Sequence, residues 1–123
     1  MHLVPVERRN RRVLDDERVC KAIAALGEPA NVAAWAERFA VVGDPSRLTL
    51  LICIARAGPI SVTDLATAAD MNDTAVSQAL RLLRASGIVV AERDGRIVRY
   101  ELADQRIGDL LDNVAPRRIR RHA

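Results

Sequence analysis

The segment 61–102 constrains the fold of this 123-residue chain more than any other. Its pattern predicts two short helices joined by a tight turn at residues 70–72, followed by two β-rich runs. Asp94-Gly95 separates these runs and is a preferred sequence for a two-residue hairpin loop. The segment therefore predicts a helix-turn-helix unit followed by a β-hairpin.

The second of these helices, expected from Asn72 to Gly87, has two different faces. At about 100° per residue, one face is apolar and the other carries short hydrogen-bonding side chains and arginines. An ordinary amphipathic surface helix shows the same contrast. Its place between a capped partner helix and a hairpin favours a helix that packs behind and contacts DNA in front. The apolar face holds Val76, Ala79, Leu80 and Leu83, and the expected DNA-contacting face holds Thr74, Ser77, Gln78, Arg81 and Arg84.

Two arginines flank the expected hairpin tip. Arg93 and Arg96 are suited to phosphates or to a minor groove. Solvated hairpin charge is the alternative interpretation. We expect both to contact DNA beside the helix.

The net charge of +3 conceals a division along the chain. Residues 1–12 hold four arginines and one acid, residues 117–121 hold four arginines, and the part between them carries a net charge of −4. Basic tails can add phosphate contacts or stay solvated. The expected tails also hold His2 and His122, which we expect to be solvated rather than to act as metal ligands. Segment 62–101 holds five arginines and six acids, which counts mildly against nucleic-acid binding unless the acids face away from the nucleic acid.

Length predicts one domain that shares its buried surface with a second copy. The expected elements, several helices and one hairpin, make its fold class mainly α (α+β). Half of the residues are hydrophobic but only three are aromatic, so the core must be aliphatic. No apolar run is long enough for a membrane span, and residues 1–12 lack the centre of a secretory signal. We therefore expect no membrane association and a cytoplasmic location. The expected boundaries are a basic tail at 1–14, a domain at 15–115 with dimerisation helices at both ends, and a basic tail at 116–123.

Four further helices frame this segment. They are expected from Asp15 to Leu26, from an Asn31 cap to Gly43, from an Asp44 cap to Gly58, and from Asp104 to Pro116. The last carries an apolar stripe that a small domain has little surface left to cover. We expect the dimer interface to form there, beside Trp35 or the first helix. The stripe consists of Ile107, Leu110, Leu111 and Val114.

The chain resembles the ArsR/SmtB family from about residue 33 to 114. The motifs are Gly-Asp-Pro-Ser-Arg-Leu at 43–48, Ala-Val-Ser-Gln-Ala-Leu-Arg-Leu-Leu-Arg at 75–84, and the Asp94-Gly95 hairpin. The helix before them looks like the N-terminal extension of CadC-type members. The resemblance implies a dimeric winged helix-turn-helix repressor with a two-stranded wing, an interface of the first and last helices, and an inducer that is often a metal ion.

The metal ligands of that family are not matched. Members with a site before the turn have cysteines where this chain has Ser61 and Thr63, whose hydroxyls are poor soft-metal ligands. Members with a site on the last helix use an Asp, matched by Asp104, and histidines where gapless counting gives arginine. Guanidinium cannot bind a metal, so no cofactor is expected. Instead, an arginine can pair with Asp104 or Asp109 across the dimer as a fixed cation. The three arginines are Arg106, Arg117 and Arg120.

The two cysteines leave a second possibility open. Cys20 and Cys53 are too few and too distant in sequence for a disulfide framework, which favours a reducing compartment. Small buried apolar residues are the favoured interpretation. The alternative is a thiol sensor for a soft metal ion, an arsenical or an oxidant, although two thiolates are too few for a closed tetrahedral site.

These observations predict a homodimeric, sequence-specific repressor that binds a palindromic operator in double-stranded DNA. No set of catalytic residues is present, so an enzyme is not expected. A rival from another class is a winged-helix module that has lost DNA binding and binds a protein through its basic tails. The negative charge of the central domain favours that rival.

Overall fold

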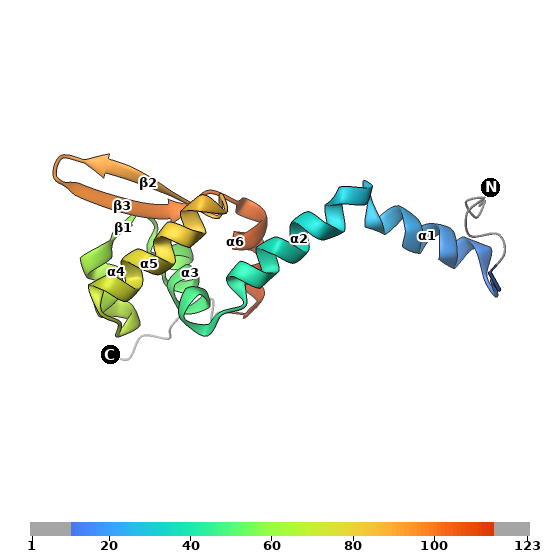
Figure 1. The fold of residues 1–123 in the computed structure, drawn as a ribbon, viewed down its shortest axis with the longest axis horizontal. Coiled ribbons are helices and arrows are strands. Elements are labelled where there is room, and N and C mark those ends of the chain that lie inside the picture. Colours follow the sequence, from blue (N-terminus) through green and yellow to red (C-terminus); the bar gives the residue numbers. More distant parts are fainter. Residues whose placement is uncertain (1–10, 115–123) are drawn as a thin grey trace, which may run out of the picture. The chain divides into compact units, whose positions relative to one another are not determined.

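The computed structural model describes residues 11–114, which form six helices and three short strands (Figure 1). The chain divides into two compact units, residues 1–37 and residues 38–123. The elements are α1 (Asp16–Leu26), α2 (Pro29–Val42), α3 (Pro45–Ala57), β1 (Ile60–Ser61), α4 (Val62–Ala69), α5 (Asp73–Ala85), β2 (Val89–Asp94), β3 (Ile97–Leu102) and α6 (Gln105–Val114). The fold is mainly α, as expected. No helix in the described range is long and apolar enough to cross a membrane.

Side-chain caps start four of the helices. Asp15, Asp44 and Ser61 each accept a backbone N–H three residues later, at 3.1, 3.1 and 3.2 Å, and Asn72 accepts one at 2.8 Å. Each cap satisfies a donor that the first helical turn leaves without a partner. The expected cap at Asn31 is wrong, because α2 begins at Pro29 and the Asn31 amide donates instead to the Leu26 carbonyl at 3.0 Å.

The sheet has three antiparallel strands in the order β1-β3-β2. The predicted two-stranded wing is present as β2 and β3, and β1 adds a third strand to the sheet by pairing with β3 through Ile60 and Tyr100. Asp94 pairs with Ile97, so the hairpin loop is Gly95-Arg96, one residue later than expected. Gly95 has φ +64° at the first loop position, which a type II′ turn requires and glycine adopts without strain.

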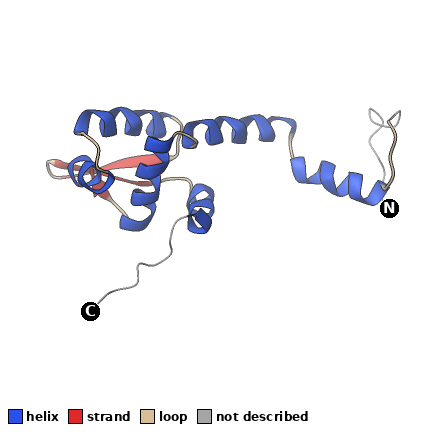
Figure 2. Ribbon diagram, turned by 90° about the horizontal axis from the view of Figure 1, so that it is seen from below, coloured by secondary structure: helices blue, strands red, loops and turns tan. Residues whose placement is uncertain are grey.

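An aliphatic core holds the second unit together. α3 packs against α4, α5, α6 and β3, and α5 also packs against β2. Figure 2 shows this small sheet with the helices around it. Burial of aliphatic side chains stabilises by about 1.5–3 kcal/mol for each side chain. The buried apolar residues are Leu50, Leu51, Ile54, Leu65, Ala66, Val76, Leu80, Leu83, Ile88, Val89, Ile107 and Leu111.

The stripe on α6 is divided between core and surface. Ile107 and Leu111 are 1% and 3% exposed within this single chain, so the expectation that the stripe lacks cover is wrong for these two. They are buried in the chain's own core, on a helix that packs against α3 and β3. Leu110 and Val114 remain 45% and 67% exposed. Of the stripe, Leu110 and Val114 are therefore the residues that remain accessible to a second copy.

Candidate nucleic-acid interface

Helix α5 buries the predicted apolar face. Val76, Leu80 and Leu83 are at most 1% exposed, and the helix contacts α3, α4 and β2. The opposite face is open to solvent over the whole helix. The exposed residues there are Thr74, Ser77, Gln78, Arg81 and Arg84, as expected for the DNA-contacting face.

The turn between α4 and α5 fixes how this face is presented. Asp70 adopts the left-handed conformation, with φ 55° and ψ 50°, which aspartate tolerates better than most residues. The backbone N–H of Met71 donates to the Ala66 carbonyl at 3.0 Å. Asn72 then caps α5. Local hydrogen bonds therefore set the angle between the two helices.

The wing places Arg93 on the face of the sheet that carries the buried Val89. Strand residues alternate between faces, so Val89, Ala91 and Arg93 share the side that packs against α5. Arg93 and Arg96 are both exposed near the loop. The hairpin lies alongside α4 and α5 in Figure 1. This arrangement presents Arg93 on the same side of the sheet as α5.

Arg99 was not singled out from the sequence. Its guanidinium donates to the Asp94 carboxylate at 2.8 Å, and Arg99 also lies opposite Glu92 in the strand register. These contacts lie on the sheet face opposite Arg93. Arg99 therefore offsets acidic charge on the wing. The pairing register that reveals this is set by the loop position, which the sequence predicted one residue too early.

Two acids lie near the proposed DNA side. Asp64 and Asp73 are exposed in the first turns of α4 and α5. A negative side chain there is stabilised by the positive end of the helix dipole. Their position explains part of the acidic excess in segment 62–101 by local helix stabilisation.

A cluster of opposite charges surrounds Asp104, whose side chain is 10% exposed. Its carboxylate accepts from the Arg106 backbone N–H at 3.0 Å and pairs with the Arg106 and Arg38 guanidinium groups at 3.2 and 3.4 Å. Burial alone would raise the pKa of Asp104, but the hydrogen bonds from Arg106 and the charges of Arg106 and Arg38 bring it below its ordinary value. The cluster therefore joins the end of α2 to the start of α6.

Replacing Asp104 by asparagine is expected to lower the free energy of unfolding by about 1 kcal/mol at pH 7. Because the folded-state pKa is lowered, this stabilisation is present above the unfolded pKa of about 3.9 and is lost as pH falls through the folded value. Urea unfolding of both proteins at pH 7 and near pH 3 measures the difference. A difference that is unchanged at acid pH would contradict the assigned pKa direction. Adding Arg106→Gln to each background shows whether Arg106 is the partner, because its effect should shrink when Asp104 is absent.

The comparisons with known proteins agree on one family. A family model described as HVO_A0114 matches residues 43–107, more than half of the chain. The HTH-type transcriptional regulator NmtR of Mycobacterium tuberculosis is 46% identical over 83 residues, which cover 68% of this chain and 66% of NmtR. The transcriptional repressor SmtB homolog of Synechocystis is 44% identical over 80 residues, which cover 65% and 60% of the two chains.

The description of one similar solved structure names the family. The homodimeric winged helix-turn-helix DNA-binding domain Mb0332 of Mycobacterium bovis, described as a possible ArsR-family transcriptional regulator, is 33% identical with a TM-score of 0.57. The match covers 72% of this chain and 84% of that one. The chain belongs to the ArsR/SmtB family. This confirms the resemblance and the winged helix-turn-helix fold.

A more distant solved structure shows the same fold. Reduced HlyU of Vibrio cholerae is 23% identical, with a TM-score of 0.64 over 68% of this chain and 87% of HlyU. The chain spans 66%, 60% and 56% of the length of NmtR, the SmtB homolog and the arsenical resistance operon repressor of Escherichia coli.

The metal ion that the ArsR/SmtB resemblance implies does not fit the described residues. Ser61 already accepts a backbone hydrogen bond as the cap of α4, and Asp104 is held by two arginines. Within residues 11–114, no group of three histidine, cysteine or acidic side chains is arranged to hold a metal ion. The alternative pairings of Arg117 and Arg120 lie outside the described residues.

The cysteines lie in different units. Cys20 is half-buried on α1, and Cys53 is half-buried on α3, where burial raises the pKa of its thiol. A raised pKa lowers the thiolate fraction, which is the reactive and metal-binding form. This disfavours Cys53 as a sensor, and the thiol alternative stays an untested prediction. His2, His122, residues 1–10 of the N-terminal tail and the whole C-terminal tail lie outside the described residues, whereas Arg11 and Arg12 are described and exposed.

Proposed function

We propose that this ArsR/SmtB member is a homodimeric transcriptional repressor that binds a palindromic operator through one α5 helix per subunit. The observation that carries the proposal is the division of α5, which buries its apolar face and exposes Gln78 and Arg81. Glutamine pairs with adenine and arginine with guanine through two hydrogen bonds each in the major groove. The names of the relatives, regulators and repressors, support the same role.

Each side chain has an expected place in the complex. Gln78 and Arg81 contact base edges, with Thr74 and Ser77 at base edges or adjacent phosphates. Arg84, Arg93 and Arg96 contact phosphates or the minor groove. The homodimeric Mb0332 domain supports two such surfaces per molecule.

Dimerisation is proposed through the exposed part of α6. Leu110 and Val114 form its apolar surface, and Phe39 on α2 is also 52% exposed. Ile107 and Leu111 support this surface from the core rather than by direct contact. Trp35, half-buried on α2, remains a proposed contact.

The proposed regulation of operator binding differs from that of a metal-sensing repressor. The Asp104 cluster places fixed cations at the start of α6, because Arg38 and Arg106 of the same chain pair with Asp104. We therefore propose a repressor that does not respond to zinc, nickel or cobalt through α6.

Selection of duplexes from a random DNA pool by the native protein tests the proposed function. Two-fold symmetry predicts that the enriched sequences are inverted repeats whose half-sites are centred about 10 base pairs apart, or a multiple of that spacing. An enriched single site without a repeat would contradict the dimeric mode, and a pool without enrichment would contradict sequence-specific binding.

A further inference from the structure

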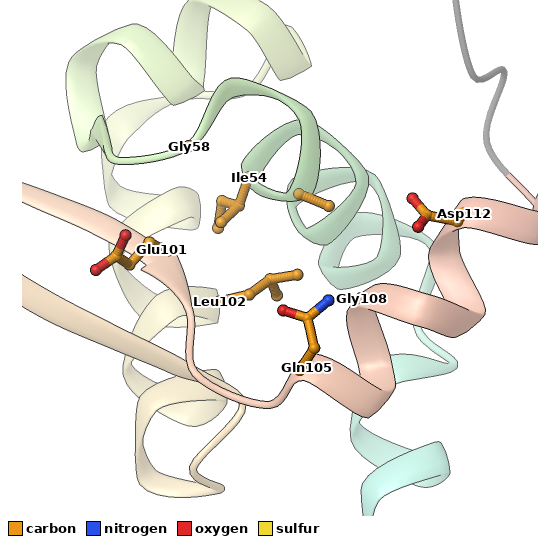
Figure 3. A pocket seen from close by; sticks show the side chains of 8 residues that line it. Ile54, Gly58, Glu101, Leu102, Gln105, Gly108 and Asp112 are labelled. Carbon is orange, nitrogen blue, oxygen red and sulfur yellow. The ribbon is translucent and has the colours of Figure 1, made fainter.

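The outer face of the wing, opposite the face that packs against α5, gathers acidic side chains around one arginine. Residues paired across β2 and β3 share a face, and successive residues along a strand alternate between faces. Figure 3 shows this alternation at the end of β3, where Leu102 points toward Ile54 and Glu101 points away from it. The residues of β2 and β3 on the outer face are Val90, Glu92, Asp94, Ile97, Arg99 and Glu101.

Arg99 binds one of these carboxylates directly. Its guanidinium Nη1 donates to the Asp94 Oδ2 at 2.8 Å, and Arg99 lies opposite Glu92 in the strand register. The two paired side chains, Arg99 and Asp94, are 36% and 79% exposed. An ion pair this exposed contributes little to the free energy of unfolding. The contact therefore matters for the charge of the wing more than for the stability of the fold.

The two wing arginines that are proposed to contact DNA flank the same carboxylate in the sequence. Arg93 precedes Asp94, and Arg96 follows it by two positions. Neither arginine forms an ion pair or a side-chain hydrogen bond with any residue in the range 11–114. Arg93 lies on the opposite face of β2 from Asp94, and Arg96 lies in the hairpin loop. Both guanidinium groups are thus exposed and unpaired while Arg99 occupies Asp94.

We propose that Arg99 is a positioning residue, which holds Asp94 and so keeps Arg93 and Arg96 free to bind DNA phosphates. Without Arg99, the carboxylates of Asp94 and Glu92 stay uncompensated beside the hairpin loop. Opposite charges attract and like charges repel, so these carboxylates would capture the wing arginines and repel the phosphates. Arg99 acts through these residues and makes no contact with DNA. The inference rests on the proposed function, because it concerns how the wing binds DNA.

A double-mutant cycle between Arg99 and Asp94 tests this role in DNA binding. Arg99→Gln is expected to weaken binding to the selected operator about five-fold, because phosphate contacts are lost at the wings of both subunits. Adding Asp94→Asn removes the competing carboxylate and should restore the affinity to that of the Asp94→Asn single variant. Fluorescence anisotropy with a labelled duplex measures all four proteins. An equal loss on removing Arg99 in both backgrounds would show that Arg99 contacts DNA itself, which would overturn the proposal.

Two further variants separate the charge of Arg99 from its shape and from net charge. Arg99→Lys keeps a cation beside Asp94 and should bind the operator within about two-fold of the native protein. Arg56→Gln removes an arginine that is 39% exposed and paired with Asp112, so it matches Arg99 in exposure and charge. It lies on α3, away from the wing, and should also stay within about two-fold. A loss in either variant as large as that of Arg99→Gln would overturn the proposal.

A measurement without DNA keeps this inference separate from the proposed function. In the native protein, NMR relaxation of the arginine Nε–Hε groups should show an ordered Arg99 and mobile Arg93 and Arg96. In Arg99→Gln, Arg93 or Arg96 should become ordered, and adding Asp94→Asn should reverse the change. If both stay mobile in Arg99→Gln, Asp94 does not capture them and the proposal fails. If the capture occurs but the native protein binds no duplex, the charge exchange on the wing stands and the proposed function fails.

Discussion

Replacing Gln78 and Arg81 together by alanine is expected to weaken binding to the selected operator by about a hundred-fold or more. Each bidentate base contact contributes about 1–3 kcal/mol of discrimination. Both side chains are exposed, so the variant should keep the native fold and its dimer. Fluorescence anisotropy with a labelled duplex measures the affinity, and circular dichroism confirms the fold.

A matched control removes the same side-chain types elsewhere. Gln105→Ala with Arg56→Ala changes exposed positions on α6 and α3, away from the proposed DNA face. This control should bind the operator about as tightly as the native protein. If the Gln78/Arg81 variant binds like its control, α5 is not the helix that contacts the bases.

Leu110→Asp is expected to convert the dimer into a monomer. Leu110 is 45% exposed on α6, and a carboxylate at an apolar interface carries a large desolvation penalty. The operator affinity should fall with it, because one subunit contacts only one half-site. Analytical ultracentrifugation measures whether the variant is a monomer or a dimer.

Leu82→Asp provides the control, since Leu82 is 41% exposed but lies on α5. It introduces the same charge at similar exposure and should sediment as a dimer. A Leu110→Asp protein that remains dimeric would place the interface elsewhere.

Local chemistry made much of this fold predictable from the sequence. Asp44, Ser61 and Asn72 cap helices through hydrogen bonds to residues three positions away, so short motifs contain all the partners. The two faces of α5 follow from helical periodicity alone. The family motifs lie on these same local features, which is why they indicated the fold correctly.

The incorrect predictions concern two kinds of feature. Some depend on interaction partners that are distant in sequence, and one depends on two hairpin loop positions that are nearly equal in energy. β1 exists because Ile60 meets Tyr100, a pairing that no local pattern reveals. The hairpin loop lies one residue later than predicted, because glycine suits either of the two loop positions. Arg38 and Asp104 are far apart in sequence, so their ion pair could not be predicted.

The α6 stripe shows the same limit for the candidate site. Periodicity placed Ile107, Leu110, Leu111 and Val114 on one side, but it could not show which of them face α3 and β3 and which face solvent. The exposure of the α5 face was predicted correctly because its buried and exposed residues differ in chemical type. On α6 all four are aliphatic, so only packing separates them.

Affinity for the selected palindromic duplex, measured as salt is raised, tests the central claim most directly. If Arg84, Arg93 and Arg96 of both subunits neutralise phosphates, the logarithm of the association constant should fall linearly with the logarithm of salt concentration, with a slope of about −5. A complex indifferent to salt, or a protein that binds no duplex but retains a protein partner, would contradict DNA binding and support the interaction module.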